Sequence, residues 1–110
     1  LDFTRRFVEM FPGVPLIIPH LGRLGGRPAD FLKAFRDAEN VYFDTALGPV
    51  DMIGRFVKTI GPERVLFGSD VPFGTMESEL RKVMALSLTD RERDLILYGN
   101  IVRIARLEIP

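Results

Sequence analysis

The chain has 110 residues, no cysteine and one histidine, and its 15 basic residues balance its 15 acidic ones. The lack of cysteine excludes a disulfide scaffold and a thiolate metal site. The balanced charge gives no field that would favour nucleic acid or an anionic membrane as a partner. The lack of cysteine also leads us to expect a cytoplasmic protein. No apolar run approaches the ~20 residues that a membrane-spanning helix needs.

Helical and strand patterns alternate along the chain. The first helical segment places four large apolar side chains on one face, which we expect to be core: Phe3, Phe7, Met10 and Phe11. The predicted elements are, in order, a helix over 2–11, a strand over 15–19, a helix from Arg27, a strand over 41–44, a helix over 51–60, a strand over 64–68, a helix from Met76 to Leu86, a helix opened by a capping box at 89–92, and a last short helix that Asn100 caps and that ends at Leu107.

This alternation implies right-handed crossovers and a parallel sheet. The strands are apolar throughout, as expected when helices cover both faces of a sheet or a barrel buries one of them. We therefore predict an α/β fold of parallel βα units with about three strands.

Polar side chains stand where the predicted strands end. His20 follows the first strand, Asp44 ends the second, and Asp70 follows the third. The carboxyl edge of a parallel sheet is where ligands bind, so we expect these three groups to converge. Asp44, which directly follows Phe43 at the end of its strand, is expected to be structural and to hydrogen-bond near Thr45.

The segment Gly68–Pro72 offers two interpretations for its aspartate. Gly68 lets the backbone turn close to a ligand, and Pro72 holds the following loop extended. Asp70 would then suit a divalent metal or the proton of a metal-bound water, but it could equally cap a loop or helix. His20 could likewise bind a metal or deprotonate water, or it could only hydrogen-bond a backbone carbonyl.

A glycine-rich loop with two arginines runs from Gly22 to Arg27. It could hold a carboxylate or phosphate against the next helix N-terminus, although it does not match a P-loop or a dinucleotide-binding pattern. We favour a solvated loop in which Arg23 is the candidate to face a substrate.

Four segments, in this order, carry a resemblance: LIIPHLG, VYFDTA, ERVLFGSDVPFG and ILYGNIVRI. Together they resemble the C-terminal part of the amidohydrolase superfamily, in its amidohydrolase-related branch. The resemblance implies that residues 1–110 are the strand 6–8 portion of a (β/α)8 TIM barrel. It also implies a metal-dependent enzyme in which metal-activated water acts on a carbonyl- or carboxylate-bearing small molecule, by hydrolysis, lactone opening or non-oxidative decarboxylation.

The resemblance also assigns roles to single residues. His20 takes the place of the strand-6 histidine, which faces the metal-bound water and becomes a ligand where the site is binuclear. Asp70 takes the place of the strand-8 aspartate, which ligates the metal and can shuttle the proton. The implied cofactor is a divalent metal, zinc in the first place and manganese in the second.

The family's remaining ligands, a strand-1 H-x-H pair and a strand-5 histidine or lysine, are not in this chain. A catalytic zinc wants about three protein ligands, and about eight strands close a barrel of this kind. We therefore expect part of a larger domain that is inactive alone, with two open sheet edges and an uncovered inner face that favour a homo-oligomer. Two alternatives stay open: a non-catalytic, self-associating half-barrel module, and a small domain that binds an anion at Arg23 and Arg27.

Overall fold

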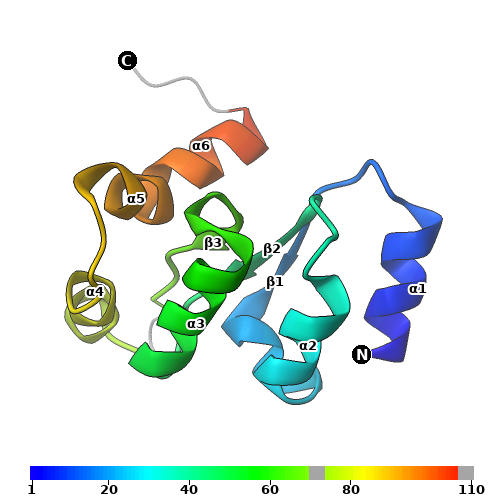
Figure 1. The fold of residues 1–110 in the computed structure, drawn as a ribbon, viewed down its shortest axis with the longest axis horizontal. Helices are drawn as coiled ribbons and strands as arrows, with labels where there is room; N and C mark the ends of the chain where they lie inside the picture. Colours follow the sequence, from blue (N-terminus) through cyan, green and yellow to red (C-terminus); the bar gives the residue numbers. More distant parts are fainter. Residues whose placement is uncertain (70–73, 107–110) are drawn as a thin grey trace.

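The computed structural model describes residues 1–69 and 74–106, and every structural statement below refers to these residues. The elements are helix α1 (Asp2–Met10), strand β1 (Leu16–Ile18), helix α2 (Pro28–Phe35), strand β2 (Val41–Asp44), helix α3 (Val50–Ile60), strand β3 (Val65–Leu66), helix α4 (Met76–Met84), helix α5 (Asp90–Asp94) and helix α6 (Asn100–Ala105) (Figure 1). Their order agrees with the predicted alternation of helices and strands.

The three strands form one parallel sheet in the order β1-β2-β3. Leu16 is paired with Val41, and Phe43 is paired with both Ile18 and Val65. Each strand thus lies beside the next strand in the sequence, with a helix in the connection between them. The predicted α/β fold with parallel βα units is confirmed.

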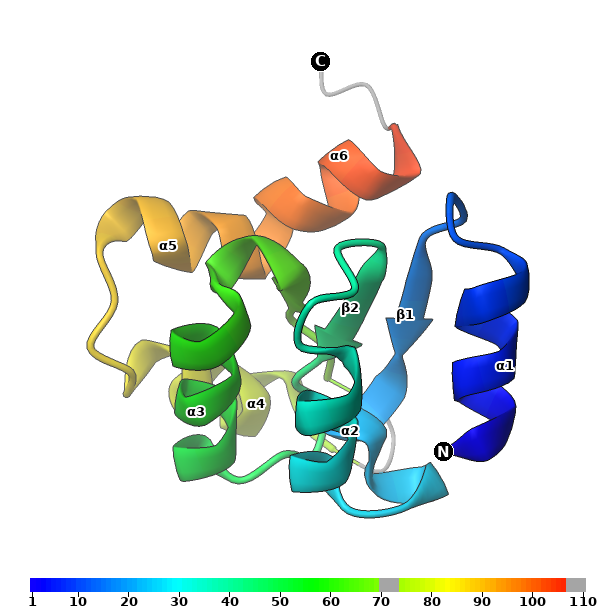
Figure 2. The same cartoon turned by 45° about the vertical axis from the view of Figure 1, so that its right-hand side comes forward.

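One face of the sheet is the core of the molecule. Along β2, Val41 and Phe43 are fully buried, whereas Tyr42 and Asp44 on the opposite face are half-buried. The Phe43 ring meets Phe56 of α3 edge-on, with 4.9 Å between ring centroids. Helices α2 and α3 lie side by side over this face (Figure 2) and bury the apolar stripes that the sequence predicts.

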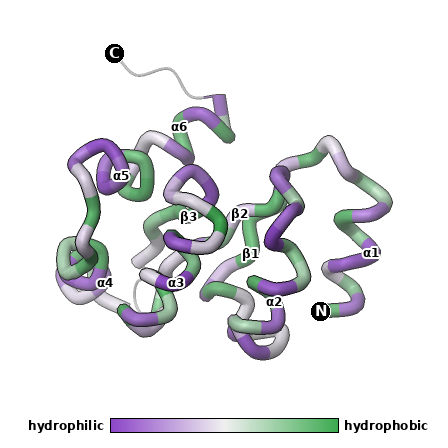
Figure 3. Tube along the Cα trace, in the orientation of Figure 1, coloured by the Kyte–Doolittle hydropathy of each residue, from purple (hydrophilic) through white to green (hydrophobic). Residues whose placement is uncertain are grey.

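Helix α1 departs from the prediction that its apolar face is core. Phe3 is 81% exposed, Met10 is 70% exposed and Phe11 is 44% exposed, and no residue of α1 is buried. The helix lies at the margin of the molecule beside β1 and still carries hydrophobic stretches (Figure 3). Its periodicity identified the helix correctly, but no described segment packs against the outer part of its apolar face.

The C-terminal helices also differ from the prediction at one residue. The capping box at Thr89 and Glu92 is present, and α5 then runs through a π-helical turn, Leu95–Gly99, directly into α6. Asn100 has helical φ and ψ angles and caps nothing. Its buried amide instead donates to the carbonyls of Pro62, at 2.6 Å, and Val65, at 2.8 Å.

These contacts place the C-terminal helical segment against β3. The N–H of Phe67, just beyond the strand, donates to the carbonyl of Ile96 at 2.9 Å. The edge beside β3 is therefore partly covered, which corrects the expectation of two open sheet edges. No helix in residues 1–69 or 74–106 is long and apolar enough to cross a membrane.

Arg64 connects backbone segments at the edge of the sheet where the strands begin, opposite the edge of the predicted site. Its guanidinium donates to the carbonyls of Val41, Arg36 and Phe35 at 2.9, 2.6 and 2.6 Å, which joins the end of α2 to the start of β2. Burial lowers the pKa of Arg64 from its ordinary value, against the opposing effect of Tyr42. These contacts connect three backbone carbonyls at the edge of the sheet where β2 begins.

Candidate functional site

Two of the residues predicted to meet at the carboxyl edge of the sheet do meet. The backbone N–H of His20, two residues after β1, donates to Oδ1 of Asp44 at the end of β2, at 3.2 Å. Asp70, the third predicted residue, lies outside the described residues. The parallel topology thus brings a histidine and an aspartate together across 24 positions of sequence, as their places at strand ends predicted.

The turn that carries His20 has an unusual backbone. His20, Leu21 and Gly22 have φ angles of 56°, 56° and 87°, all in the left-handed region. That region costs about 1–2 kcal/mol for each residue other than glycine. The fully buried Leu21 anchors the turn in the core, and a β-carbon at Gly22 would lie 2.5 Å from the Phe31 ring. Strain that the surroundings hold in place is concentrated at functional sites in proteins.

Asp44 binds the backbone of two turns, the one after β1 that carries His20 and the one after β2 that carries Ala46. Its Oδ1 accepts the N–H of Ala46 at 2.9 Å as well as the N–H of His20. Gly68, which follows β3, approaches so closely that a β-carbon there would lie 3.0 Å from the Asp44 carboxyl carbon. These contacts agree with the structural role expected of Asp44 near Thr45.

The imidazole of His20 is oriented by a backbone carbonyl. Its Nδ1 lies 2.9 Å from the oxygen of Ala46. A carbonyl oxygen only accepts hydrogen bonds, so Nδ1 carries the proton in this contact. When the ring is neutral, its lone pair is then on Nε2, which is the atom able to take a proton from water or to bind a metal.

The two arginines of the glycine-rich loop engage different partners. Arg27 is exposed and donates from Nε to Oδ2 of Asp30 at 2.9 Å, within the first turn of α2. Arg23 is exposed and points a guanidinium nitrogen at the carbonyl oxygen of Leu47, 3.5 Å away. Arg23 therefore lies beside the loop that orients His20, whereas Arg27 is held by its own helix.

The described residues do not form a metal centre by themselves. Within 1–69 and 74–106, no group of three histidine, aspartate or glutamate side chains could hold a metal ion. A catalytic zinc site has about three protein ligands and an open position. His20 can supply one nitrogen donor through Nε2, and the predicted ligand Asp70 is not among the described residues.

Glu79 on α4 is a charged residue that the sequence did not single out. Its side chain is 2% exposed, and its Oε1 accepts the backbone N–H of Leu47 at 3.1 Å. Lys82, one helical turn further on, lies 3.0 Å from its Oε2. A Glu–Lys pair at this spacing is ordinary on exposed helix surfaces, so nothing local distinguished this pair as buried.

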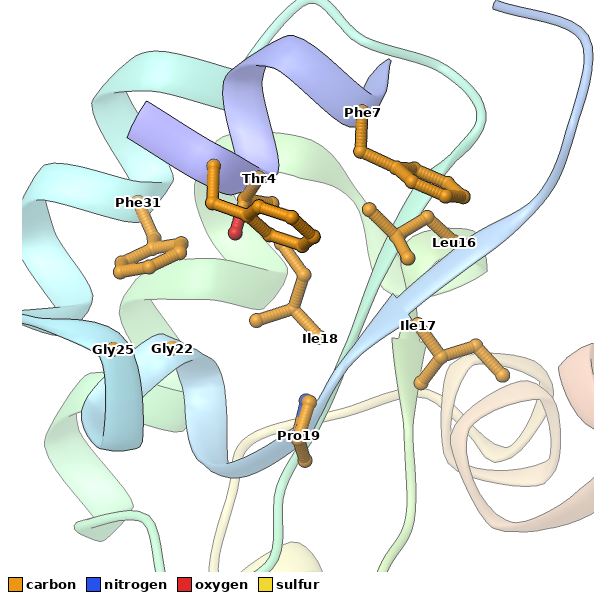
Figure 4. Close-up of a pocket in the computed structure, with 10 residues that line it drawn as sticks. Thr4, Phe7, Leu16, Ile17, Ile18, Pro19, Gly22, Gly25 and Phe31 are labelled. Atoms are coloured by element: carbon orange, nitrogen blue, oxygen red, sulfur yellow. The ribbon is translucent and has the colours of Figure 1, made fainter. Parts of the chain in front are cut away.

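An apolar pocket of about 480 Å³ lies between α1, β1 and α2. Phe7 of α1 and Leu16 of β1 approach it from one side, and Phe31 of α2 borders it from another (Figure 4). Among the described residues that line it, Thr4 has the one polar side chain and none is titratable. The pocket therefore offers apolar contact area and no catalytic group.

The fold is that of an α/β protein built from parallel βα units, a class in which ligands commonly bind beyond the carboxyl ends of the strands. The chain belongs to the amidohydrolase family, whose family model matches residues 3–107. The resemblance carried by the four segments is thereby confirmed. No curated protein matches the chain.

Similar solved structures show the same fold over most of this chain. An amidohydrolase 2 from Bifidobacterium longum subsp. infantis has 22% identity and a TM-score of 0.75, over 96% of this chain and 45% of that one. An uncharacterised TIM-barrel protein from Bordetella bronchiseptica has 19% identity and a TM-score of 0.76, over 96% and 38%. A dihydroxybenzoic acid decarboxylase from a Polaromonas species, with bound manganese and 2-nitroresorcinol, has 18% identity and a TM-score of 0.72, over 94% and 37%.

These structures define what kind of fold the chain has. The chain spans less than half the length of each of the three proteins. Its three parallel strands and their helices match a portion of a TIM barrel, as predicted from the resemblance.

Proposed function

We propose that the chain contributes part of the active site of a metal-dependent amidohydrolase-type enzyme. A divalent metal held there would supply activated water for chemistry on a carbonyl- or carboxylate-bearing small molecule, by hydrolysis, lactone opening or non-oxidative decarboxylation. The observation that carries this proposal is the contact between His20 Nδ1 and the Ala46 carbonyl, because it directs the basic nitrogen of the ring to Nε2. Membership in the amidohydrolase family supports the same class of chemistry.

The implied metal is divalent, and zinc and manganese both fit nitrogen and oxygen donors. A bound divalent metal ion would lower the pKa of its water toward ~7. Asp70 is proposed as a ligand, and His20 as a further ligand in a binuclear site. Because the described residues hold no complete ligand set, the remaining donors would come from outside the described residues.

His20 is proposed to act as the base that accepts a proton from the reacting water. Its Nε2 accepts the proton, while the Ala46 carbonyl holds the ring and the Asp44 carboxylate holds its backbone. Arg23, exposed beside Leu47, is the candidate to bind a substrate carboxylate, because a guanidinium matches a carboxylate with two parallel hydrogen bonds.

The proposal is tested in the full-length protein that carries this chain, loaded with zinc or manganese. A dihydroxybenzoate, assayed by release of carbon dioxide, and an aryl lactone, assayed by release of protons, serve as probes of the two reaction types. We expect metal-dependent turnover of at least one probe, and we expect Asp70→Ala to lose the metal or nearly all turnover. A variant that retained both its metal and its full turnover would exclude the role proposed for Asp70.

A second candidate function is a non-catalytic half-barrel module that associates with itself. The observation that favours it is the apolar face of α1, on which Phe3 and Met10 are exposed. Exposed apolar area of this kind marks association surfaces. Metal-dependent turnover that requires His20 and Asp70 would decide for the enzyme.

A further inference from the structure

We propose that Glu79 is a positioning residue, which holds the imidazole of His20 through the peptide group between Ala46 and Leu47. The inference deepens the proposed function, and only its catalytic consequence rests on that function. The hydrogen bonds themselves do not depend on whether the protein binds a metal.

Both polar atoms of this one peptide group are engaged. Its N–H, on Leu47, donates to Oε1 of Glu79 at 3.1 Å. Its carbonyl oxygen, on Ala46, lies 2.9 Å from Nδ1 of His20. The N–H and C=O of a trans peptide lie in one plane and point in opposite directions, so the carboxylate and the imidazole flank the peptide from its two ends.

The carboxylate of Glu79 is buried as a charged group because Lys82 accompanies it. The ammonium of Lys82 lies 3.0 Å from Oε2 and 3.3 Å from Oε1. The contact with Oε2 is an ion pair without hydrogen-bond geometry, since Oε2 has no hydrogen-bond partner among the described residues. A buried charge is tolerated when it is paired in this way, and the pair leaves Oε1 to accept the N–H of Leu47.

A negative charge at the N–H end of a peptide polarises it and makes its carbonyl a stronger acceptor. A stronger acceptor at Ala46 favours the proton on Nδ1 of His20. The Glu79 carboxylate thus favours one tautomer of His20, as carboxylates do for histidines in metal sites. Here the carboxylate acts from α4 through an intervening peptide, and it does not touch the ring.

The same carboxylate also fixes the backbone around this peptide. Leu47 has a φ angle of 58°, a strained value for leucine. Gly74, which precedes α4, packs so closely that a β-carbon there would lie 3.1 Å from the Leu47 side chain and 3.2 Å from Oε1 of Glu79. Glu79 therefore contacts the loop after β2, and the close approach of Gly74 leaves no room there for a β-carbon.

The test is ¹⁵N NMR of the imidazole nitrogens, which reports the tautomer without any substrate or metal. His20 is the one histidine of these 110 residues, so its ring signals are not overlapped by those of another histidine. Glu79→Gln keeps the acceptor and removes the charge, whereas Glu79→Leu removes both. Glu77→Gln on the exposed side of α4 and Val83→Ala in the core serve as controls for charge and for stability.

We expect the wild-type protein and both controls to hold the proton on Nδ1. Glu79→Leu should raise the ratio of the Nε2–H to the Nδ1–H tautomer by roughly fivefold, the ratio that corresponds to one net hydrogen bond. Glu79→Gln should raise this ratio by less. If Glu79→Leu does not fold, the ratio measured in Glu79→Gln alone tests the inference. A shifted tautomer ratio supports the inference even if the protein turns over neither probe. Failure of the inference can therefore be distinguished from failure of the proposed function. An unchanged ratio in a folded Glu79→Gln variant, or an equal shift in Val83→Ala, would overturn it.

Discussion

At the scale of single residues, two carboxylate side chains hold the backbone at the carboxyl edge of the sheet. Asp44 accepts the N–H groups of His20 and Ala46, and Glu79 accepts that of Leu47. Each therefore satisfies a backbone donor in or beside a turn with left-handed φ angles. The positions of His20 and Asp44 at strand ends followed from sequence, but left-handed leucines leave no local pattern to recognise.

A second residue-scale feature predicts a response to acid. The hydrogen bonds that Glu92 accepts from the backbone and side chain of Thr89 hold the pKa of its carboxyl below the ordinary value. A carboxyl whose pKa is lower in the folded protein adds stability above its unfolded pKa of about 4.3, and that stability is lost as the pH falls through the folded value. We expect Glu92→Gln to have a lower Tm than the wild type at pH 7 and to match it well below pH 4.3.

Thermal unfolding at both pH values, followed by circular dichroism, measures this difference. Glu77→Gln is the matched control, because Glu77 is exposed in the first turn of α4 and belongs to no capping box. The account of Glu92 would be wrong if the Tm deficit of Glu92→Gln were the same at acid and neutral pH.

At the scale of elements, tertiary contacts of the C-terminal helices outweigh the local sequence pattern that predicted a helix start at Asn100. An asparagine before an apolar stretch is a good helix cap on local grounds, and so a helix start was predicted at Asn100. The helix instead runs through that position, and the buried side chain of Asn100 donates to the part-buried carbonyl of Pro62 and the buried carbonyl of Val65. The capping box at Thr89 was predictable, since its two partners are local in sequence.

This contact between α6 and β3 predicts a large loss of stability on mutation. Asn100→Ala removes the donor to two backbone carbonyls, which we expect to lower the free energy of unfolding by about 1–3 kcal/mol. Urea unfolding of the wild type and the variant measures this loss in the free energy of unfolding. Asn40→Ala is the control, because Asn40 donates a single exposed bond to the carbonyl of Val14 and should cost less. Equal losses in the two variants would contradict the role given to Asn100.

At the scale of the whole molecule, the sheet is covered unevenly. Helices α2 and α3 bury one face, whereas α1 presents Phe3, Met10 and Phe11 to the outside. The order of elements and their parallel pairing were predictable, because periodicity and chain connectivity determine both. Periodicity also identifies the apolar face of a helix, but whether that face is buried depends on what packs against it.

The uneven coverage predicts self-association of the 110-residue chain. Sedimentation velocity at tens of micromolar should show species larger than a monomer, because apolar side chains and a pocket of about 480 Å³ are open beside β1. Phe3→Glu should reduce that association, and Ser87→Glu, which adds the same charge away from α1, should not. A monomer at all concentrations would refute this prediction.

The central claim is that His20 is the proton-accepting residue of a metal-dependent amidohydrolase-type site. Its most direct test is His20→Ala in the full-length, metal-loaded protein, with metal content and kcat measured on the same samples. We predict that a mononuclear metal stays bound while kcat falls by ~10²-fold or more, the usual cost of losing a general base. Full turnover in this variant would contradict the claim.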